Sequence, residues 1–202
     1  MLGNVFIRYW ISRYNFKSLF RCEIDSIFQP KRKYEISSLQ HNCSFLENNY
    51  CNHYKVFTDG SKDMMSNSGA AFFDPQINEG FKFKICHSMS ITHLELIAIS
   101  RALSYIKLIN SNKFVILTDS KSALQHVARC FSYLRGTSIA YEIIKSIEDL
   151  TSYSKEIILQ WIPSHIGLSG NEEVDILAKQ ACTDGDSVND MPFFTDCCFF
   201  DI

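Results

Sequence analysis

Four acidic residues stand out because each lies beside apolar residues, where a solvated surface charge is not expected. Asp59 and Asp119 each follow a short apolar run, whereas Glu95 and Asp175 lie in helix-like segments between apolar neighbours. Buried carboxylates that lie close together repel one another, and a bound divalent cation resolves that conflict. Hard oxygen ligands favour Mg²⁺ or Mn²⁺. Two such ions beside a phosphate can orient an attacking water and stabilise the leaving oxygen.

Taken singly, each acid has a simpler interpretation. An Asp at the end of a strand is usually a turn residue, and a Glu in the first turn of a helix, as expected for Glu95, complements the helix dipole. The four acids together, each on a suitable element, favour a metal site instead. His165, ten residues before Asp175 in a glycine-containing loop, adds a side chain that can move protons near neutral pH.

The segments that carry these residues predict one α/β domain over about residues 54–183. The five expected strands are 54–58, 69–73, 81–86, 114–117 and 157–161. The four expected helices are 92–109, one capped by Ser120, 136–150 and 170–182. This order predicts a mixed sheet covered by helices. Asp59 and Asp119 are then expected beyond the carboxyl ends of two strands, where ligands bind in such sheets.

Composition agrees with a globular domain, because 46% of the 202 residues are hydrophobic and 21% are charged. The net charge of -2 gives no basic balance, so a role with nucleic acid has to rest on the site. Eight cysteines without a CxxC motif indicate a reducing compartment and no disulfide framework. No apolar run approaches the roughly 18 residues of a membrane span, so we expect an intracellular chain without membrane contact.

The chain ends are expected to lie outside this domain. Residues 1–53 are interpreted as a leader, with a helix over 1–19 and a linker at 29–33. Residues 184–202 are interpreted as an irregular acidic tail, since they contain five Asp and no Lys or Arg.

The motifs around the acids resemble those of type 1 ribonuclease H, over roughly residues 54–183. They are Thr58-Asp59-Gly60-Ser61, Thr92-His93-Leu94-Glu95-Leu96, Thr118-Asp119-Ser120, Trp161-Ile162-Pro163-Ser164-His165, and Gly170-Asn171-Glu172 followed by Asp175. The sequences of these motifs are most similar to those of that domain in non-LTR retrotransposon polyproteins of arthropods. The leader resembles the segment that follows the reverse transcriptase in such polyproteins.

The resemblance implies a ribonuclease H-like fold, with a five-stranded mixed sheet in the order 3-2-1-4-5 flanked by helices. It implies that Asp59, Glu95, Asp119 and Asp175 bind two Mg²⁺ ions, for which Mn²⁺ can substitute. It also implies that His165 transfers protons. The reaction would be endonucleolytic hydrolysis of the RNA strand of an RNA–DNA hybrid, leaving 3′-hydroxyl and 5′-phosphate ends.

Choosing RNA for cleavage requires contacts to the 2′-hydroxyl. We expect these from backbone and polar groups near Gly60, Ser61, Thr92 and Asn171, although Ser61 and Thr92 can equally be turn and helix caps. The expected partners are the hybrid itself and a reverse transcriptase domain in cis or in trans, with the chain as a monomer. The extra basic helix of the bacterial pattern is missing between the second and third expected helices, which argues against tight independent substrate binding.

Three alternatives remain open from the sequence. Integrases and transposases also place acids on such a sheet but cut and join DNA; the Ser164-His165 loop favours the ribonuclease. The chain can also be a remnant that binds nucleic acid without cutting it, although all four acids are present. A further alternative is a zinc site formed by His41, Cys43, Cys51 and His53, whose spacing fits no zinc module that we recognise.

Overall fold

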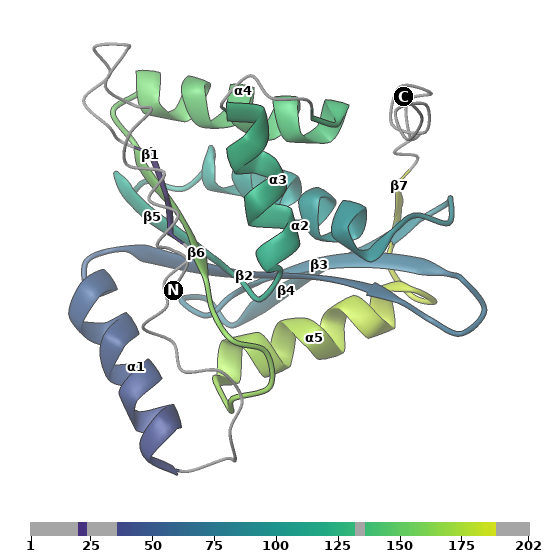
Figure 1. The fold of residues 1–202 in the computed structure, drawn as a ribbon, viewed down its shortest axis with the longest axis horizontal. Coiled ribbons are helices and arrows are strands. Elements are labelled where there is room, and N and C mark those ends of the chain that lie inside the picture. The colour runs from purple at the N-terminus through teal and green to yellow at the C-terminus, as the bar shows by residue number, and fades with distance from the viewer. Residues whose placement is uncertain (1–19, 24–35, 132–135, 189–202) are drawn as a thin grey trace, which may run out of the picture.

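Seven strands form one mixed sheet in the order β1-β6-β5-β2-β3-β4-β7 in the computed structural model, which describes residues 20–23, 36–131 and 136–188 (Figure 1). The strands are β1 (Phe20–Glu23), β2 (Tyr54–Lys62), β3 (Ser68–Asp74), β4 (Glu79–Ile85), β5 (Lys113–Thr118), β6 (Glu156–Trp161) and β7 (Asp186–Val188). The helices are α1 (Ile36–Tyr50), α2 (Ile91–Ile106), α3 (Lys121–Phe131), α4 (Ser138–Ser152) and α5 (Ser169–Ala181).

The central five strands confirm the predicted α/β fold and its 3-2-1-4-5 order, because they follow one another as β4-β3-β2-β5-β6. Strands β2, β3 and β4 form the expected antiparallel meander, and β2, β5 and β6 pair in parallel. The predicted strand count of five was too low. Strands β1 and β7 add parallel pairs at the two edges, and such short strands carry too little alternation to be seen in a sequence.

Both faces of the sheet are covered by helices, with α2, α3 and α4 on one face and α1 and α5 on the other (Figure 1). Strand β5 shows how its sequence serves both faces. Phe114 and Ile116 join the core under α2, α3 and α4, while Val115 and Leu117 join the core on the α1 and α5 side. Side chains of a strand point alternately to opposite faces. A strand buried on both sides therefore needs a continuous apolar run, as predicted for residues 114–117.

Helix α1 lies in the segment that was expected to be a leader. Leu46 and Tyr50 are buried and pack with the core on the α5 side of the sheet. The Tyr50 hydroxyl also donates a hydrogen bond of 2.5 Å to Oε1 of Gln160, a fully buried side chain of β6. The leader therefore contributes part of the fold. The helix expected over 1–19 and the linker at 29–33 lie outside the described residues.

Element boundaries differ from the prediction in two places. The tail expected to be irregular from residue 184 instead contributes β7. Strand β2 continues to Lys62, so Asp59 lies inside it rather than at its end. The four predicted helices are confirmed, and their ends shift by one to three residues. The largest shift is at the end of the helix expected over 92–109, because α2 ends at Ile106. Of the helices that the structure describes, none has the length and apolar character needed to cross a bilayer.

If α1 is part of the fold, truncating its buried side chain should destabilise the protein. Leu46 is 5% exposed, so we expect Leu46→Ala to lower the free energy of unfolding by about 2–3 kcal/mol, through lost burial and the cavity left behind. Leu108, which is 85% exposed, supplies the matched control, and Leu108→Ala should change it little. Urea unfolding measures both. Equal small effects at the two positions would show that α1 does not contribute to the core.

Candidate metal centre

Two of the four acids are brought side by side by the pairing of β2 with β5. That parallel pairing ends at Thr58 and Thr118, so Asp59 and Asp119 come directly after the last pair. Strand β2 does not stop there, because Asp59 remains paired with Ala71 of β3. The two carboxylates therefore emerge where the parallel strands separate. This is the carboxyl-end crevice in which α/β sheets bind their ligands.

Helix α2 brings the third acid through an unusually close approach to β2. A Cβ atom added to Gly60 would lie 2.6 Å from the backbone nitrogen of Glu95, so only glycine allows this contact. The helix begins one residue earlier than predicted, at Ile91, and its N-cap is Ser90, whose side chain accepts a bond from the His93 backbone N–H. Glu95 consequently lies just beyond the first turn, where its side chain reaches Asp59 within β2.

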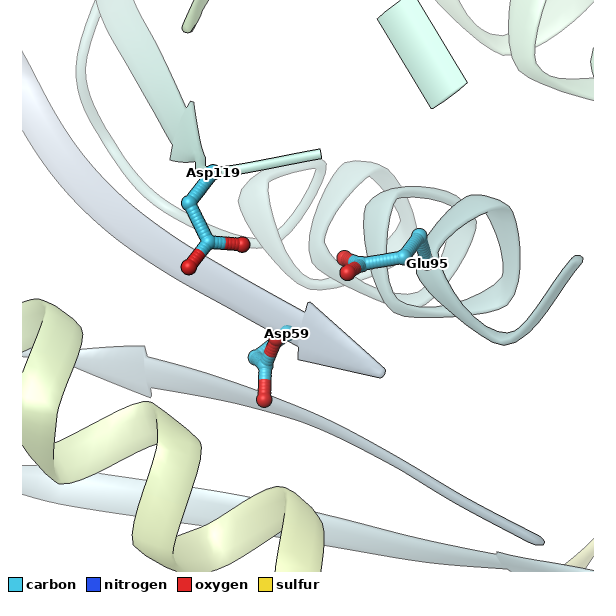
Figure 2. Close-up of side chains that lie close together, drawn as sticks. All are labelled: Asp59, Glu95 and Asp119. Carbon is cyan, nitrogen blue, oxygen red and sulfur yellow. The ribbon is translucent and has the colours of Figure 1, made fainter. Parts of the chain in front are cut away.

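The three carboxylates converge, as Figure 2 shows, from β2, from α2 and from the residue after β5. One oxygen from each of Asp59, Glu95 and Asp119 lies within 4.8 Å of the others. Glu95 is only 4% exposed, and its Oε2 is buried without a hydrogen-bond partner among the described residues. A buried carboxylate oxygen left unpaired is costly, and a divalent cation would satisfy it. The donor set therefore fits a hard cation.

Burial and mutual repulsion raise the pKa values of all three acids. For Asp59, burial first and then the charges of Asp119 and Asp175 raise the pKa to about 8. For Glu95, burial followed by the charge of Asp59 raises the pKa well above its usual value. Burial also raises the pKa of Asp119. The raised pKa values make each carboxyl hold its proton more strongly than an ordinary carboxyl does, so a cation that binds here competes with protons.

Several neighbours hold Asp119 in place. The indole Nε1 of Trp161 donates a hydrogen bond of 3.1 Å to the Asp119 backbone carbonyl. The side chain of Asn171 hydrogen-bonds to the Asp119 side chain, which opposes the effect of burial and lowers the pKa of that carboxyl. Ser120 caps α3, as predicted, by accepting from the Ala123 backbone N–H. The position of this carboxylate is thus fixed from β6, from α5 and from its own backbone.

Asp175, the fourth expected ligand, stands beside the trio rather than within it. Its negative charge raises the pKa of both Asp59 and Asp119, so it lies near them. Its own Oδ2 accepts a hydrogen bond of 2.6 Å from the ammonium of Lys179, one turn along α5. This hydrogen bond raises the pKa of Lys179. Lys179 was not predicted from the sequence, although its spacing of four residues from Asp175 was the signal for the pair.

His165 lies in the loop between β6 and α5, and its backbone has a φ of 52°, in the left-handed region. Its Nδ1 lies 3.9 Å from Oε2 of Glu172, and its side chain is half exposed. The other carboxylate oxygen of Glu172 accepts a hydrogen bond of 3.2 Å from the Gly167 backbone N–H, which ties the loop to α5. The charge of His165 lowers the pKa of Asp119, so this side chain stands near the cluster.

The residues expected to contact a substrate occupy different settings. Gly60 is buried against α2 and Asn171 is turned inward, while Ser61 is half-buried where β2 passes the cluster. Thr92 is not the helix cap, and its hydroxyl lies 3.1 Å from that of Ser122 on α3.

The alternative zinc site gains no support from the described residues. Cys43, Cys51 and His53 form no group of possible metal ligands there, and the side chain of His41 lies outside the described part.

In a comparison with known protein families, the family model described as RNase H matches residues 51–183. This span begins just after α1, runs from β2 through α5, and contains the three clustered acids, Asp175 and His165.

Because the acids keep protons in the folded state, the metal-free protein should lose stability as pH rises from about 5 to about 8. Asp59 and Glu95 have folded pKa values above those of the unfolded chain. The folded state therefore binds more protons than the unfolded state in this window, and each step to higher pH favours unfolding. Urea unfolding at several pH values in EDTA measures this contribution as the difference between the unaltered chain and Asp59→Asn.

A suitable control is Asp63→Asn. The side-chain hydrogen bond from Asn67 lowers the pKa of Asp63, so Asp63 titrates below the window and the variant should keep the full dependence. If Asp59→Asn has the same pH dependence as the unaltered chain, Asp59 does not hold a proton in the folded state near neutral pH.

Proposed function

The chain belongs to the RNase H family, and on that premise we propose that Asp59, Glu95, Asp119 and Asp175 hold two Mg²⁺ ions for hydrolysis of the RNA strand of RNA–DNA hybrids. The family match indicates hydrolase activity on hybrids and the use of divalent cations. The observation that supports the assignment of residues is the buried trio, in which Glu95 has an unpartnered oxygen. Mn²⁺ should substitute for Mg²⁺, because it has the same preference for oxygen ligands.

The roles of the residues follow from their settings. Glu95 and Asp59 supply the least exposed ligands, and Asn171 and Trp161 fix the Asp119 carboxylate and backbone. When bound, the cations activate a water molecule and stabilise the charge on the leaving 3′ oxygen. His165, half exposed beside the cluster, transfers a proton during the reaction. Water adds to phosphorus and the P–O3′ bond breaks, which leaves a 3′-hydroxyl on one fragment and a 5′-phosphate on the other.

Recognition of RNA is assigned to groups around the cluster that can reach a 2′-hydroxyl. The proposal includes the backbone at Gly60 and the side chains of Ser61 and Thr92. Ser61 of β2 and Thr92 of α2 are both partly exposed. Asn171 is also included, although its bond to Asp119 supports a positioning role as well.

The biological setting is proposed from the sequences of the motifs, which resemble those of retrotransposon ribonuclease H domains. We propose that residues 54–183 form the ribonuclease H domain of a non-LTR retrotransposon polyprotein, and that it acts inside the cell on hybrids made by a reverse transcriptase domain. The chain would not associate with further copies of itself and would act as a monomer. Residues 56–183 carry twelve Lys and Arg against thirteen Asp and Glu, so they have no net positive charge with which to bind phosphates. The attached reverse transcriptase domain would therefore supply much of the affinity for the phosphate backbone.

The proposal predicts cleavage of a labelled RNA–DNA hybrid in Mg²⁺ and its loss in EDTA. Asp119→Asn should lower the rate by more than about a hundredfold, because it keeps the shape of the side chain but removes a charged ligand. Asp149→Asn, on the exposed surface of α4, is the matched control and should cleave normally. Circular dichroism should show that both variants remain folded.

The same assay separates the alternatives. Strand transfer or nicking of an all-DNA duplex would assign the chain to the integrase class. Binding of the hybrid without any cleavage would indicate a remnant. Normal cleavage by Asp119→Asn would show that the clustered acids are not the metal ligands.

A second prediction concerns His165→Ala. Loss of a proton-transfer group typically lowers a rate by about 10²–10⁴-fold, so turnover should fall while the cations still bind. Single-turnover cleavage measures the rate, and calorimetry with Mg²⁺ measures binding. Added imidazole should restore part of the rate. If His165→Ala instead abolishes Mg²⁺ binding, His165 is a ligand or a structural residue.

A further inference from the structure

A positive charge of the protein itself stands on one side of the acid cluster. The ammonium of Lys179 lies 2.6 Å from Oδ2 of Asp175, and its charge lowers the pKa of Asp59. The Lys179 side chain is 61% exposed, whereas that of Asp175 is 22% exposed. The pair is therefore anchored at its acidic end and open to solvent at its basic end. The opposite side of the cluster differs, because there Glu95 is buried with an oxygen that no described residue satisfies.

We propose that the Lys179 ammonium pairs with Asp175 as long as no second divalent cation is bound. A second divalent cation has to displace this ammonium from Asp175, so Lys179 weakens the binding of that cation. This inference rests on the proposed metal-binding role of the four acids. It makes Lys179 a positioning residue that sets the occupancy of the Asp175 side, and it leaves the trio of Asp59, Glu95 and Asp119 to bind the first cation.

The physical basis is competition for one carboxylate. A divalent cation that binds Asp175 has to share or take over a carboxylate whose Oδ2 already accepts the Lys179 hydrogen bond, and it is also repelled by the ammonium. Exposed ion pairs contribute little, so the competition is modest and a second cation can overcome it. The long side chain of Lys179 can swing into solvent, because most of it is exposed. The Asp175 side can thus exchange its cation more readily than the Glu95 side.

A second Lys–Asp pair supplies a matched comparison. Lys82 of β4 donates a hydrogen bond of 2.9 Å to Asp184, which lies beyond the end of α5 and is almost fully exposed. The two pairs share residue types, and both are within hydrogen-bonding distance, but only the pair of Lys179 includes a proposed ligand. Removing either lysine takes one positive charge from the protein, so a difference between the variants reports on position rather than on net charge.

The test is a titration of the full chain with Mn²⁺ in the absence of nucleic acid, followed by electron paramagnetic resonance and calorimetry. Of two bound Mn²⁺ ions, the more weakly bound one should bind to Lys179→Met roughly two- to fivefold more tightly than to the unaltered chain. This is the range expected from the loss of an exposed ion pair. If the unaltered chain binds only one Mn²⁺ ion, Lys179→Met should bind a second Mn²⁺ ion weakly. Lys82→Met should bind Mn²⁺ like the unaltered chain. In Asp175→Asn, the further change Lys179→Met should have no effect, because the contested ligand is gone.

Unchanged or weaker Mn²⁺ binding by Lys179→Met would overturn the inference, as would an equal gain in Lys82→Met. These outcomes are distinct from failure of the proposed function. If Asp119→Asn binds Mn²⁺ as tightly as the unaltered chain, the cluster itself is not the metal site, whatever Lys179 does.

Discussion

The contact between β2 and α2 at Gly60 is the constraint on which the site depends. Any side chain at this position would push the helix away, since a Cβ atom would fall 2.6 Å from the Glu95 nitrogen and 2.7 Å from the carbonyl carbon of Leu94. With glycine there, the second turn of α2 lies directly over the strand that carries Asp59. The Glu95 carboxylate is consequently held where it is only 4% exposed, and no flexible loop is needed to bring it there.

This arrangement costs stability, and the rest of the fold has to offset that cost. Three carboxylates share a buried corner, and burial raises the pKa of each of them. The offset comes from apolar cores on both faces of the sheet, one under α2, α3 and α4 and one under α1 and α5. Helix α1 belongs to that compensation, because it covers β6 and closes the second core with Leu46 and Tyr50. A domain cut at the start of the family match would lose this cover.

Local pattern in the sequence predicted the five central strands and singled out four acids, three of which cluster, whereas the order of the strands was implied by the resemblance to ribonuclease H. The apolar run at 114–117 and the acid after it define both a buried strand and the crevice at its end. Features that depend on distant contacts were not predictable in this way. Helix α1 has a weak apolar stripe and is recognised only by what Leu46 and Tyr50 touch, and β7 is too short to show alternation. The inward turn of Asn171 toward Asp119 likewise depends on the approach of α5 to the end of β5.

The four acids are not equivalent, and their exposure suggests why the cluster is built unevenly. Glu95 is 4% exposed and Asp59 is 9% exposed, so their positions are set by packing. Asp175, Lys179 and His165 lie on the partly exposed side, where side chains can rearrange at little cost. Hydrolysis needs both properties. A fixed inner side would keep the proposed cation in one geometry, whereas substrate, water and product would enter and leave through the other side. A lysine that can release Asp175 belongs on the side where that exchange takes place.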